Sequence, residues 1–512
     1  MKSSMTMHTP ARRSARLAIW SAVALLAGCA AVGPDYERPA VVLPDGFGHS
    51  GSSASFSGPE GSLPAEWWRL YGDAELTSLI DRALAANTTI AQAVARVELA
   101  QAQLREAGGA YLPSVNGNAS AGRSSSSALS LGNQGRSFTG NSFGLSLSTS
   151  FEIDFWGRLR RTEEAARAQL LGTAAARDTV RLTVASAVAQ NWFALRSLDA
   201  QIAATDQTLR SRVQGLRVFR QRLDAGVGSG LEVEQAEILR TDSAVLLREL
   251  QRQRAVTVSQ LALLTGEPGL QLQASLVRPL MVGSAASAAA SSASGVSAGE
   301  VGTSVANGAA ATPPPPPLPP PGLPSTLLDR RPDIRAAEAQ LAAANATIGV
   351  AQANRLPTVS LTGSLGQQST ELQSVLNAPA RLWSLGIGLT APIFDGGRLA
   401  ARADQARARQ QEALGAWRGT VQTAFKEVAD ALTAVSAARE SALDLQRRDR
   451  SAQAALRLAQ ARFDAGYSGN LELLDAQRVA TSAQLEAVRN LQQQYGASID
   501  LIKALGGGWS GY

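Results

Sequence analysis

Apolar and small polar residues alternate in two short stretches of this chain. In the first stretch the mainly apolar positions are Phe143, Leu145, Leu147, Thr149, Phe151 and Ile153, and a Gly, Ser or Glu stands between each pair of them. The second stretch runs from Leu385 to Ile393, and shorter runs at Val115 and at 359–365 predict one partner strand in each half of the chain. A period of two residues predicts β-strands with one apolar and one polar face. We therefore expect four strands, flanked by polar loops at 122–142 and 367–381.

Two environments suit strands of this kind. A soluble hairpin would bury the apolar face against a core, whereas a membrane strand of about 9 to 11 residues turns that face to lipid. Because the pattern occurs in both halves of the chain, we favour membrane strands over a soluble hairpin. Four strands cannot close a barrel, and an open edge in lipid leaves backbone groups unpaired. The chain must then share its barrel with copies of itself; three chains would supply twelve strands, and a dimer is also open.

A second pattern predicts very long helices. From Arg158 to Asp224 the chain contains no proline and is rich in Ala, Arg, Gln and Leu, and a continuous helix of this length would measure ~100 Å. Apolar residues recur there at seven-residue steps, at Leu195, Ile202, Leu209, Leu216 and Leu223. This spacing predicts coiled-coil packing. A glycine follows at Gly226, where the left-handed conformation can close the helix, and a second helix is expected to return to about Leu264.

The chain also repeats itself. The sequence "YLPSV" begins at residue 111 and "RLPTV" at 355. The stretch "LDAGVGSGLEVEQAE" at 223–237 returns as "FDAGYSGNLELLDAQ" at 463–477. Self-similarity of this kind predicts two equivalent halves, each with a strand pair and a long helical hairpin.

The N-terminus has the layout of a secretory signal. Four basic residues precede the apolar run from Leu17 to Ala27, and Leu-Ala-Gly-Cys follows, ending at Cys29. A transmembrane anchor is the alternative, but about eleven apolar residues are too few to span a bilayer. The tetrapeptide resembles the lipobox of bacterial lipoproteins, and Cys29 is the only cysteine in 512 residues, so lipid attachment at Cys29 is expected. Because Ala30 rather than Asp follows, the resemblance favours the outer membrane.

Composition divides the chain further. The formal net charge of the whole chain is +6, and four of its positive charges lie in the signal, so the remaining chain carries about +2. So small a positive charge gives no support for a nucleic-acid partner. Residues 283–322 consist mainly of Ala, Ser, Gly, Val and Pro, with Glu300 as the only charge, and predict a mobile linker. We therefore expect a signal peptide at 1–28, a lipid-anchored N-terminal segment at 29–62, a first repeat at 63–275, a low-complexity Ala/Ser/Pro linker at 276–324 and a second repeat at 325–512.

Residues suited to catalysis are sparse. After the signal the only histidine is His49, in a Gly/Ser-rich stretch, so neither a zinc-protease motif nor a serine triad can be assembled. The only lysines there are Lys426 and Lys503, and neither follows a glycine as a phosphate-binding loop requires. We expect no enzyme, no cofactor and no metal site.

Several motifs together resemble the TolC-type outer-membrane factor family, specifically its lipoprotein (NodT-like) branch in resistance-nodulation-division efflux systems. They are "CAAVGPDYERP" from residue 29, "LPSTLLDRRPDIRAAE" from 323, "PIFDGGRL" from 392, "FKEVADAL" from 425, "LLDAQ" from 473 and "IDLIKALGGGW" from 499. The resemblance implies a mixed α and β homotrimer with a twelve-stranded outer-membrane β-barrel and a periplasmic α-helical coiled-coil barrel. It further implies a passive export channel that works with a periplasmic adaptor (membrane fusion) protein and an inner-membrane pump.

The resemblance also implies site residues. The periplasmic end of such a tunnel closes like an iris, and the constriction residues of this branch match Leu471 and Asp475, with Glu472 adjacent. Adaptor docking is implied at the two hairpin turns, through Gly226, Val227, Gly228 and Ser229 in the first and Gly466, Tyr467, Ser468 and Gly469 in the second. The first copy has Gln235 where the second has Asp475. A simpler role for Asp475 is a carboxylate favoured in the first turn of a helix.

Two other functions stay open at this stage. One is a lipid-anchored periplasmic coiled-coil scaffold without a pore, and the other is an outer-membrane channel for protein secretion. The lipobox and the "LLDAQ" segment favour efflux. The resemblance does not specify the exported substrate, so drugs, metal ions and phenolics are all open.

Overall fold

The computed structural model describes residues 31–41, 64–127, 138–272, 316–317, 327–377 and 380–508. Its contacts divide the chain into two compact units. The first comprises Met1–Val41, Ala95–Ala175 and Arg335–Thr420, and the second comprises Val42–Val94, Ala176–Ile334 and Val421–Tyr512. Each unit therefore draws on both halves of the sequence, and the boundaries expected for the two repeats stay a prediction.

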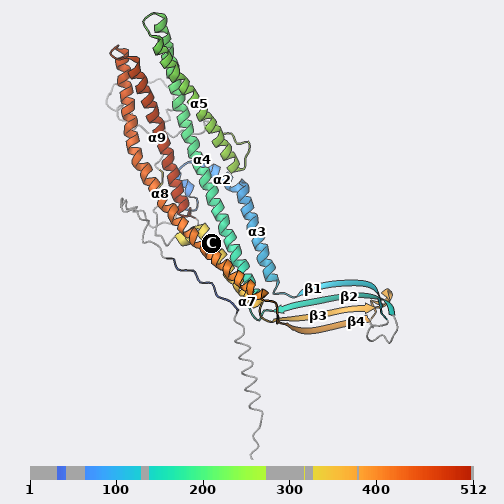
Figure 1. Ribbon diagram of the computed structural model, residues 1–512. Helices are drawn as coiled ribbons and strands as arrows, with labels where there is room; N and C mark the ends of the chain where they lie inside the picture. Colours follow the sequence, from blue (N-terminus) through green and yellow to red (C-terminus); the bar gives the residue numbers. More distant parts are fainter. Residues whose placement is uncertain are drawn as a thin grey trace, which may run out of the picture. The chain divides into compact units, whose positions relative to one another are not determined.

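The first unit contains a four-stranded antiparallel sheet (Figure 1). Its strands are β1 (Ser114–Ser126), β2 (Phe138–Ile153), β3 (Thr358–Ser369) and β4 (Arg381–Thr390), paired in sequence order. The four predicted strands are thus present. They reach further into the expected polar loops, because the ladder continues from Gly122 opposite Ser142 to Ser126 opposite Phe138. Strand β4 ends before Ile393, where Pro392 lacks the N–H that a further ladder bond would need.

The register gives the sheet two different faces. Leu147 lies opposite Leu365, and Leu361 opposite Ile387, so the apolar positions of neighbouring strands fall on one face. The intervening positions are small and polar, and on that face the Ser364 and Ser384 hydroxyls lie 2.7 Å apart. On the apolar face Leu385, Ile387 and Leu389 are more than 70% exposed. An apolar face of this kind needs a lipid environment rather than water.

Short side chains allow the helices of the first unit to pack closely. These are most of α3 (Thr88–Gly109) and α7 (Pro332–Ala353), together with the beginnings of α4 and α8. Ala346 and Ala403 are completely buried. A Cβ added to Gly172 of α4 would lie 3.3 Å from the Ala339 Cβ of α7, so glycine permits this approach. The short helix η3 (Leu372–Ser374) lies between β3 and β4.

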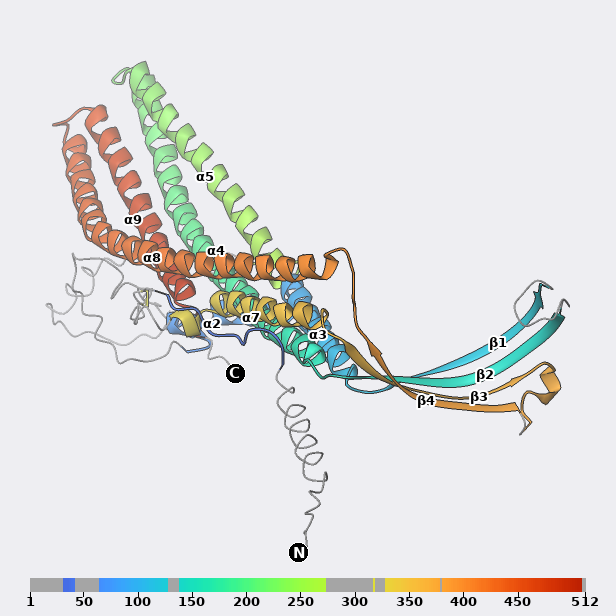
Figure 2. The same cartoon turned by 60° about the horizontal axis from the view of Figure 1, so that its bottom comes forward.

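Two long helical hairpins dominate the second unit. Helix α4 (Arg158–Asp224) is followed by α5 (Gly230–Thr265), and α8 (Arg398–Asp464) by α9 (Asn470–Ala504) (Figure 2). Both α4 and α8 contain 67 residues, as the first proline-free segment and the repeat predict. Among the described residues, no helix is both apolar enough and long enough to cross a membrane.

An aromatic core joins the bases of these hairpins to the N-terminal helices of the second unit. The Phe193 and Tyr495 rings of α4 and α9 stack with centroids 4.1 Å apart. They pack with Trp67 and Tyr71 of η1 (Trp67–Tyr71) and with the apolar side of α2 (Ala74–Ala86). The short α6 (Leu327–Arg330) buries Leu327 against α8 and α9. Six aromatic side chains are therefore buried together where the two hairpins meet the N-terminal helices.

Candidate gate and docking turns

The first hairpin turn is closed by several local hydrogen bonds. Gly226 has a φ of 75°, and the Val227 N–H donates to the Arg222 carbonyl at 3.0 Å. Ser229 then caps α5: its Oγ accepts from the Leu231 N–H at 3.2 Å, and its own N–H donates to the Glu232 carboxylate at 3.1 Å. This reciprocal arrangement is a capping box, and it satisfies N–H groups that the start of a helix leaves free.

The second hairpin turn repeats the closure of α8 but lacks the cap of the next helix. Gly466 has a φ of 73°, and the Tyr467 N–H donates to the Arg462 carbonyl at 2.8 Å. Gly469 stands where the first turn has Ser229, and it has no side chain with which to cap α9. The two turns therefore share a backbone path and differ in how the returning helix begins.

Leu471 and Asp475 lie on one exposed stripe of α9. They are four residues apart, which places them on the same helix face, and Leu471 is 70% exposed. Arg478 continues the stripe and donates to the Asp475 carboxylate at 2.8 Å. The sequence interpretation missed Arg478, although its position three residues after Asp475 on a helix was a usable signal. The structure thus places an apolar and a charged group together at the beginning of α9.

Glu472 does not belong to this stripe. Its carboxylate lies 3.6 Å from the Arg462 guanidinium of α8, across the hairpin. In the first turn the equivalent Glu232 caps the helix instead. Glu472 therefore links the two arms of the second hairpin, a different position from that of Leu471 and Asp475.

Buried polar groups without partners distinguish the second turn. Asn470 is only 5% exposed, and neither its amide nitrogen nor its amide oxygen has a hydrogen-bond partner within the described part of the chain. The Ser468 hydroxyl is buried and equally unsatisfied there. A buried polar group without a partner destabilises the state that contains it. The second turn thus retains hydrogen-bonding capacity that a rearrangement or a partner can satisfy.

The two hairpins meet just behind their turns. The Phe219 ring of α4 and the Phe463 ring of α8 pack edge to face with centroids 6.0 Å apart. A cavity of about 330 Å³ adjoins this contact and is lined by both rings and by Leu473 of α9. The two hairpins therefore contact each other through an aromatic pair that borders an open hollow.

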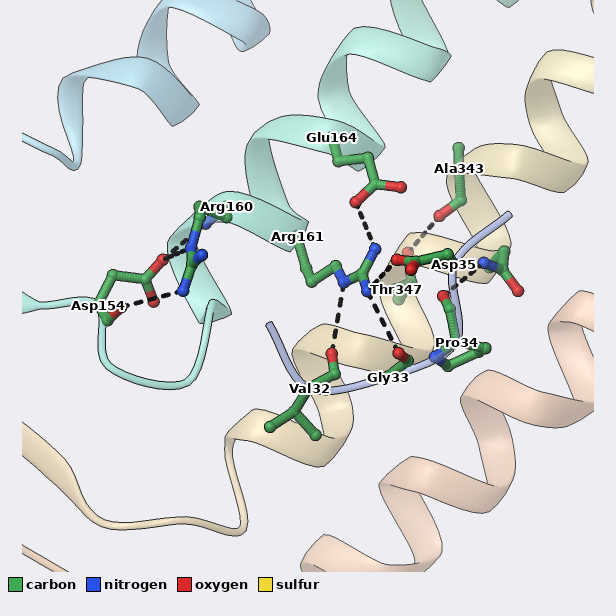
Figure 3. Close-up of polar contacts among 11 residues, drawn as sticks. Val32, Gly33, Pro34, Asp35, Asp154, Arg160, Arg161, Glu164, Ala343 and Thr347 are labelled. Carbon is green, nitrogen blue, oxygen red and sulfur yellow. Dashed lines mark hydrogen bonds and ion pairs between the residues drawn. The ribbon is translucent and has the colours of Figure 1, made fainter. Parts of the chain in front are cut away.

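A third region of interest is the segment that follows the predicted lipidation site. Cys29 itself lies outside the described residues. Figure 3 shows the guanidinium of Arg161, on α4, surrounded by this segment. Arg161 donates to the Asp35 carboxylate at 2.7 Å, to the Gly33 carbonyl at 3.2 Å and to the Glu164 carboxylate at 2.8 Å. Burial lowers the pKa of Arg161, but the hydrogen bonds with Asp35 and Glu164 outweigh burial, and the net shift raises the pKa.

Further contacts hold the same segment against α7. The Asn345 amide donates to the Pro34 carbonyl at 2.9 Å, and Arg38 forms an ion pair with Glu338. A Cβ added to Gly349 would lie 2.7 Å from the Val32 carbonyl oxygen, so this approach needs glycine. The segment is therefore built into the first unit. Sequence reasoning missed this arrangement because its partners are more than 100 residues apart.

A sheet with one face suited to lipid and two long helical hairpins in one chain define a subunit of an outer-membrane channel. The chain belongs to the outer membrane efflux protein family, whose model matches residues 79–267 and 323–507. It is 34% identical over 488 residues to the outer membrane protein OprJ of Pseudomonas aeruginosa, covering 95% of each chain. It is 32% identical to the cation efflux system protein CusC of Escherichia coli, covering 94% of this chain and 96% of CusC.

Solved structures agree with this assignment. The open state of the MtrE outer membrane channel of Neisseria gonorrhoeae matches with a TM-score of 0.75 at 30% identity, covering 94% of this chain and 98% of MtrE. The predicted fold class, a trimeric outer-membrane β-barrel with a periplasmic α-helical barrel, is confirmed. The predicted function and location are confirmed as well: the protein is the outer-membrane channel component of an efflux system and extends into the periplasm.

Proposed function

We propose that the protein is a passive export duct whose periplasmic gate is formed by the second hairpin turn. The observation that carries the proposal is the exposed stripe of Leu471 and Asp475 at the start of α9. In a trimer, three copies of this stripe would surround the axis with a ring of carboxylates and an apolar constriction. Rings of charge and apolar constrictions are the two common ways in which a pore is closed or made selective.

The ion pair between Asp475 and Arg478 does not remove this ring. Both side chains are more than half exposed, and an exposed pair contributes only ~0.2–1 kcal/mol. Arg478 can therefore exchange Asp475 for another partner at little cost.

The gate is tested by single-channel conductance in planar bilayers. The double variant Leu471→Ala/Asp475→Ala should conduct several-fold more than the wild type because it lacks both the charge and the plug. The matched control is Leu231→Ala/Gln235→Ala, which changes the equivalent positions of the first hairpin. Leu231 is 66% exposed and Leu471 70%, so the two variants expose comparable surfaces. An unchanged conductance of the first variant in an intact trimer would reject the gate.

We further propose that the two turns receive a periplasmic adaptor protein, which couples the channel to an inner-membrane pump of the resistance-nodulation-division class. The most accessible side chains there are Val227, 70% exposed, and Tyr467, 81% exposed. Glycines on both sides of them let a partner's backbone approach closely. The docking set comprises Gly226, Val227, Gly228 and Ser229 with Gly466, Tyr467, Ser468 and Gly469.

Docking is tested by cross-linking in cells that co-express the adaptor. A photoreactive amino acid at position 227 or 467 should form a cross-link to the adaptor. The same amino acid at exposed Leu443, on α8 away from the turn, should not. Equal labelling at all three positions would contradict docking at the turns.

We propose that Cys29 carries the lipid anchor and that Arg161 positions the anchored end. Intact-mass analysis of the mature protein should show an acylated Cys29 and no acyl group in Cys29→Ala. In Arg161→Gln the protein should stay acylated, while a protease should cut residues 31–41 faster because the segment has lost the guanidinium. Wild-type cleavage rates in Arg161→Gln would reject the positioning role.

Finally, we infer that the chain supplies no energy and performs no catalysis of its own. In the mature sequence neither Lys426 nor Lys503 follows a glycine, as a phosphate-binding loop would require. The purified trimer should therefore leave ATP unhydrolysed in the absence of its pump. We also propose that the pump and adaptor select the cargo, because an open duct offers many weak contacts rather than one specific site.

A further inference from the structure

The apolar face of the sheet ends in an arginine on each edge strand. Along β4 this face reads Leu389, Ile387, Leu385, Trp383 and then Arg381. Along β1 it reads Val115, Gly117, Ala119, Ala121 and then Arg123. Both arginines are exposed. Arg123 lies three residues before the end of β1 and Arg381 is the first residue of β4, so both stand near the end of the sheet where β1 connects to β2 and β3 to β4. The lipid-facing side therefore terminates in positive charge at this end.

These two arginines differ from those at the opposite end of the sheet. There, Arg158 pairs with Glu152 at 2.6 Å and Arg160 with Asp154 at 3.4 Å. Within the described residues, the Arg123 and Arg381 guanidinium groups form no ion pair and no hydrogen bond. Their cross-strand neighbours are Asn141 and Gln367, which are uncharged. The sequence contains no acid between residues 115 and 150, and only Glu371 between residues 360 and 394.

The order of residues along β4 indicates the depth of the charges. A charge on the lipid face is costly at the bilayer midplane and nearly free at the interface. Trp383 is 79% exposed, and tryptophan prefers the boundary between hydrocarbon and head groups. Arg381 lies two residues beyond it, about 6.6 Å further along the strand. Arg381 therefore reaches the level of the head groups, on the side of the membrane away from the helices.

We propose that Arg123 and Arg381 bind the phosphate groups of lipid head groups in the outer leaflet of the outer membrane. Their guanidinium groups have free donors, and the planar donor pattern of a guanidinium matches two oxygens of one phosphate. The one acid in the β3–β4 connection, Glu371, forms no ion pair with either arginine in the described part of the chain, so an anionic lipid is the complementary partner. Phosphate bound at this level would fix the height of the barrel in the membrane.

Arg123 and Arg381 come close to each other only when three chains close the barrel. Strands β1 and β4 are the two edges of the sheet, so closing the barrel brings β4 of one copy beside β1 of the next. Arg381 and Arg123 then lie on the two strands of the same seam and on the same lipid-facing side. Three such seams would give three phosphate sites, each shared by two subunits. The depth of each arginine does not depend on this step.

Native mass spectrometry of the purified trimer tests the proposal with diphosphoryl lipid A as the probe. The wild-type trimer should bind it about tenfold more tightly than Arg123→Gln/Arg381→Gln does, the size expected for losing charge-assisted hydrogen bonds. The Arg123→Lys/Arg381→Lys variant should keep part of the affinity. Arg96→Gln/Arg217→Gln removes the same charge from exposed positions of α3 and α4 and should bind like the wild type.

Two arms separate this proposal from the proposed gate and from a folding defect. The wild type should bind lipid A with its phosphates removed about tenfold more weakly than it binds the diphosphoryl probe, and this arm needs no variant. The conductance of reconstituted Arg123→Gln/Arg381→Gln trimers should equal that of the wild type, because the gate is elsewhere. Two results would overturn the proposal. One is that the wild type binds the two lipids equally well. The other is that an intact Arg123→Gln/Arg381→Gln trimer binds the probe as tightly as the wild type does.

Discussion

The first and second hairpin turns follow the same backbone path but differ in how well their polar groups are satisfied. Ser229 and Glu232 form a reciprocal cap at the first turn. The second turn has Gly469 in place of the serine, leaves Asn470 and Ser468 unsatisfied within the described residues, and directs Glu472 to Arg462. A duplicated element can therefore keep its geometry while one copy loses local stability.

The packing behind the two turns differs in the same direction. In the first hairpin, Leu216 and Phe219 bury large side chains against α5. At the equivalent positions the second hairpin has a partly buried Leu456 and a buried Ala459. Small side chains bury less apolar area and stabilise a helix pair less. A moving gate is expected in the less stable copy, because segments that move are drawn from the low-stability end of a structure.

The largest effect is expected from Asn470→Ala. Removing a buried amide without partners should stabilise the second turn by about 1–3 kcal/mol, measured as slower hydrogen exchange at residues 468–473. The mirror variant Gly230→Asn should have little effect, because a Cβ at Gly230 meets no atom within 4 Å and the new amide stays solvated. Faster exchange in Asn470→Ala would mean that another subunit satisfies this amide in the trimer.

Ser229→Ala should have the next largest effect. It removes the cap of α5 and should destabilise the first turn by about 1 kcal/mol. Hydrogen exchange at residues 229–233 should become faster, while exchange at 469–473 should not change. If the second turn were affected equally, the two turns would be energetically coupled rather than independent.

A smaller effect is expected from Gly469→Ser. With Glu472 three residues later, the new serine recreates the capping box of the first turn and should stabilise the second by a few tenths of a kcal/mol. Glu472 would then exchange Arg462 for the backbone N–H of the substituted residue. Channel opening should become rarer in bilayer recordings. More frequent opening would contradict the view that the missing cap favours movement.

The smallest effect is expected from Glu472→Gln. The carboxylate is 3.6 Å from Arg462, and both side chains are about half exposed. Such a pair contributes ~0.2–1 kcal/mol and is weakened by salt. Conductance at high salt should therefore be the same in this variant and the wild type. A large increase at high salt would place Glu472 in the gate beside Leu471 and Asp475.

Local patterns made much of the fold predictable from the sequence. The absence of proline between Arg158 and Asp224 predicted a helix with those bounds. Gly226 adopts the expected left-handed conformation, and its counterpart in the repeat, Gly466, does the same. The alternation of apolar and polar residues identified the four strands, but it did not show where each strand ends. The serine-rich residues 122–126 have no apolar alternation, and their pairing with β2 depends on a ladder that only the folded sheet provides.

The candidate site was predictable only in part. Leu471 and Asp475 were identified through a family resemblance, and the helical spacing could have added Arg478. The unsatisfied amide of Asn470 could not be predicted, because burial depends on what packs around the turn. The contact between Arg161 and Asp35 joins residues 126 positions apart, and no local pattern marks it.

A reciprocal exchange of Asp475 and Gln235 tests whether the two turns are interchangeable. The variant Asp475→Gln/Gln235→Asp moves one carboxylate per subunit from the second turn to the first and keeps the net charge of the trimer. The measurement is single-channel conductance beside that of Asp475→Gln alone. Both variants should show the same raised conductance, because a charge at the first turn cannot replace the ring at the gate. Wild-type conductance in the exchanged variant would contradict this expectation.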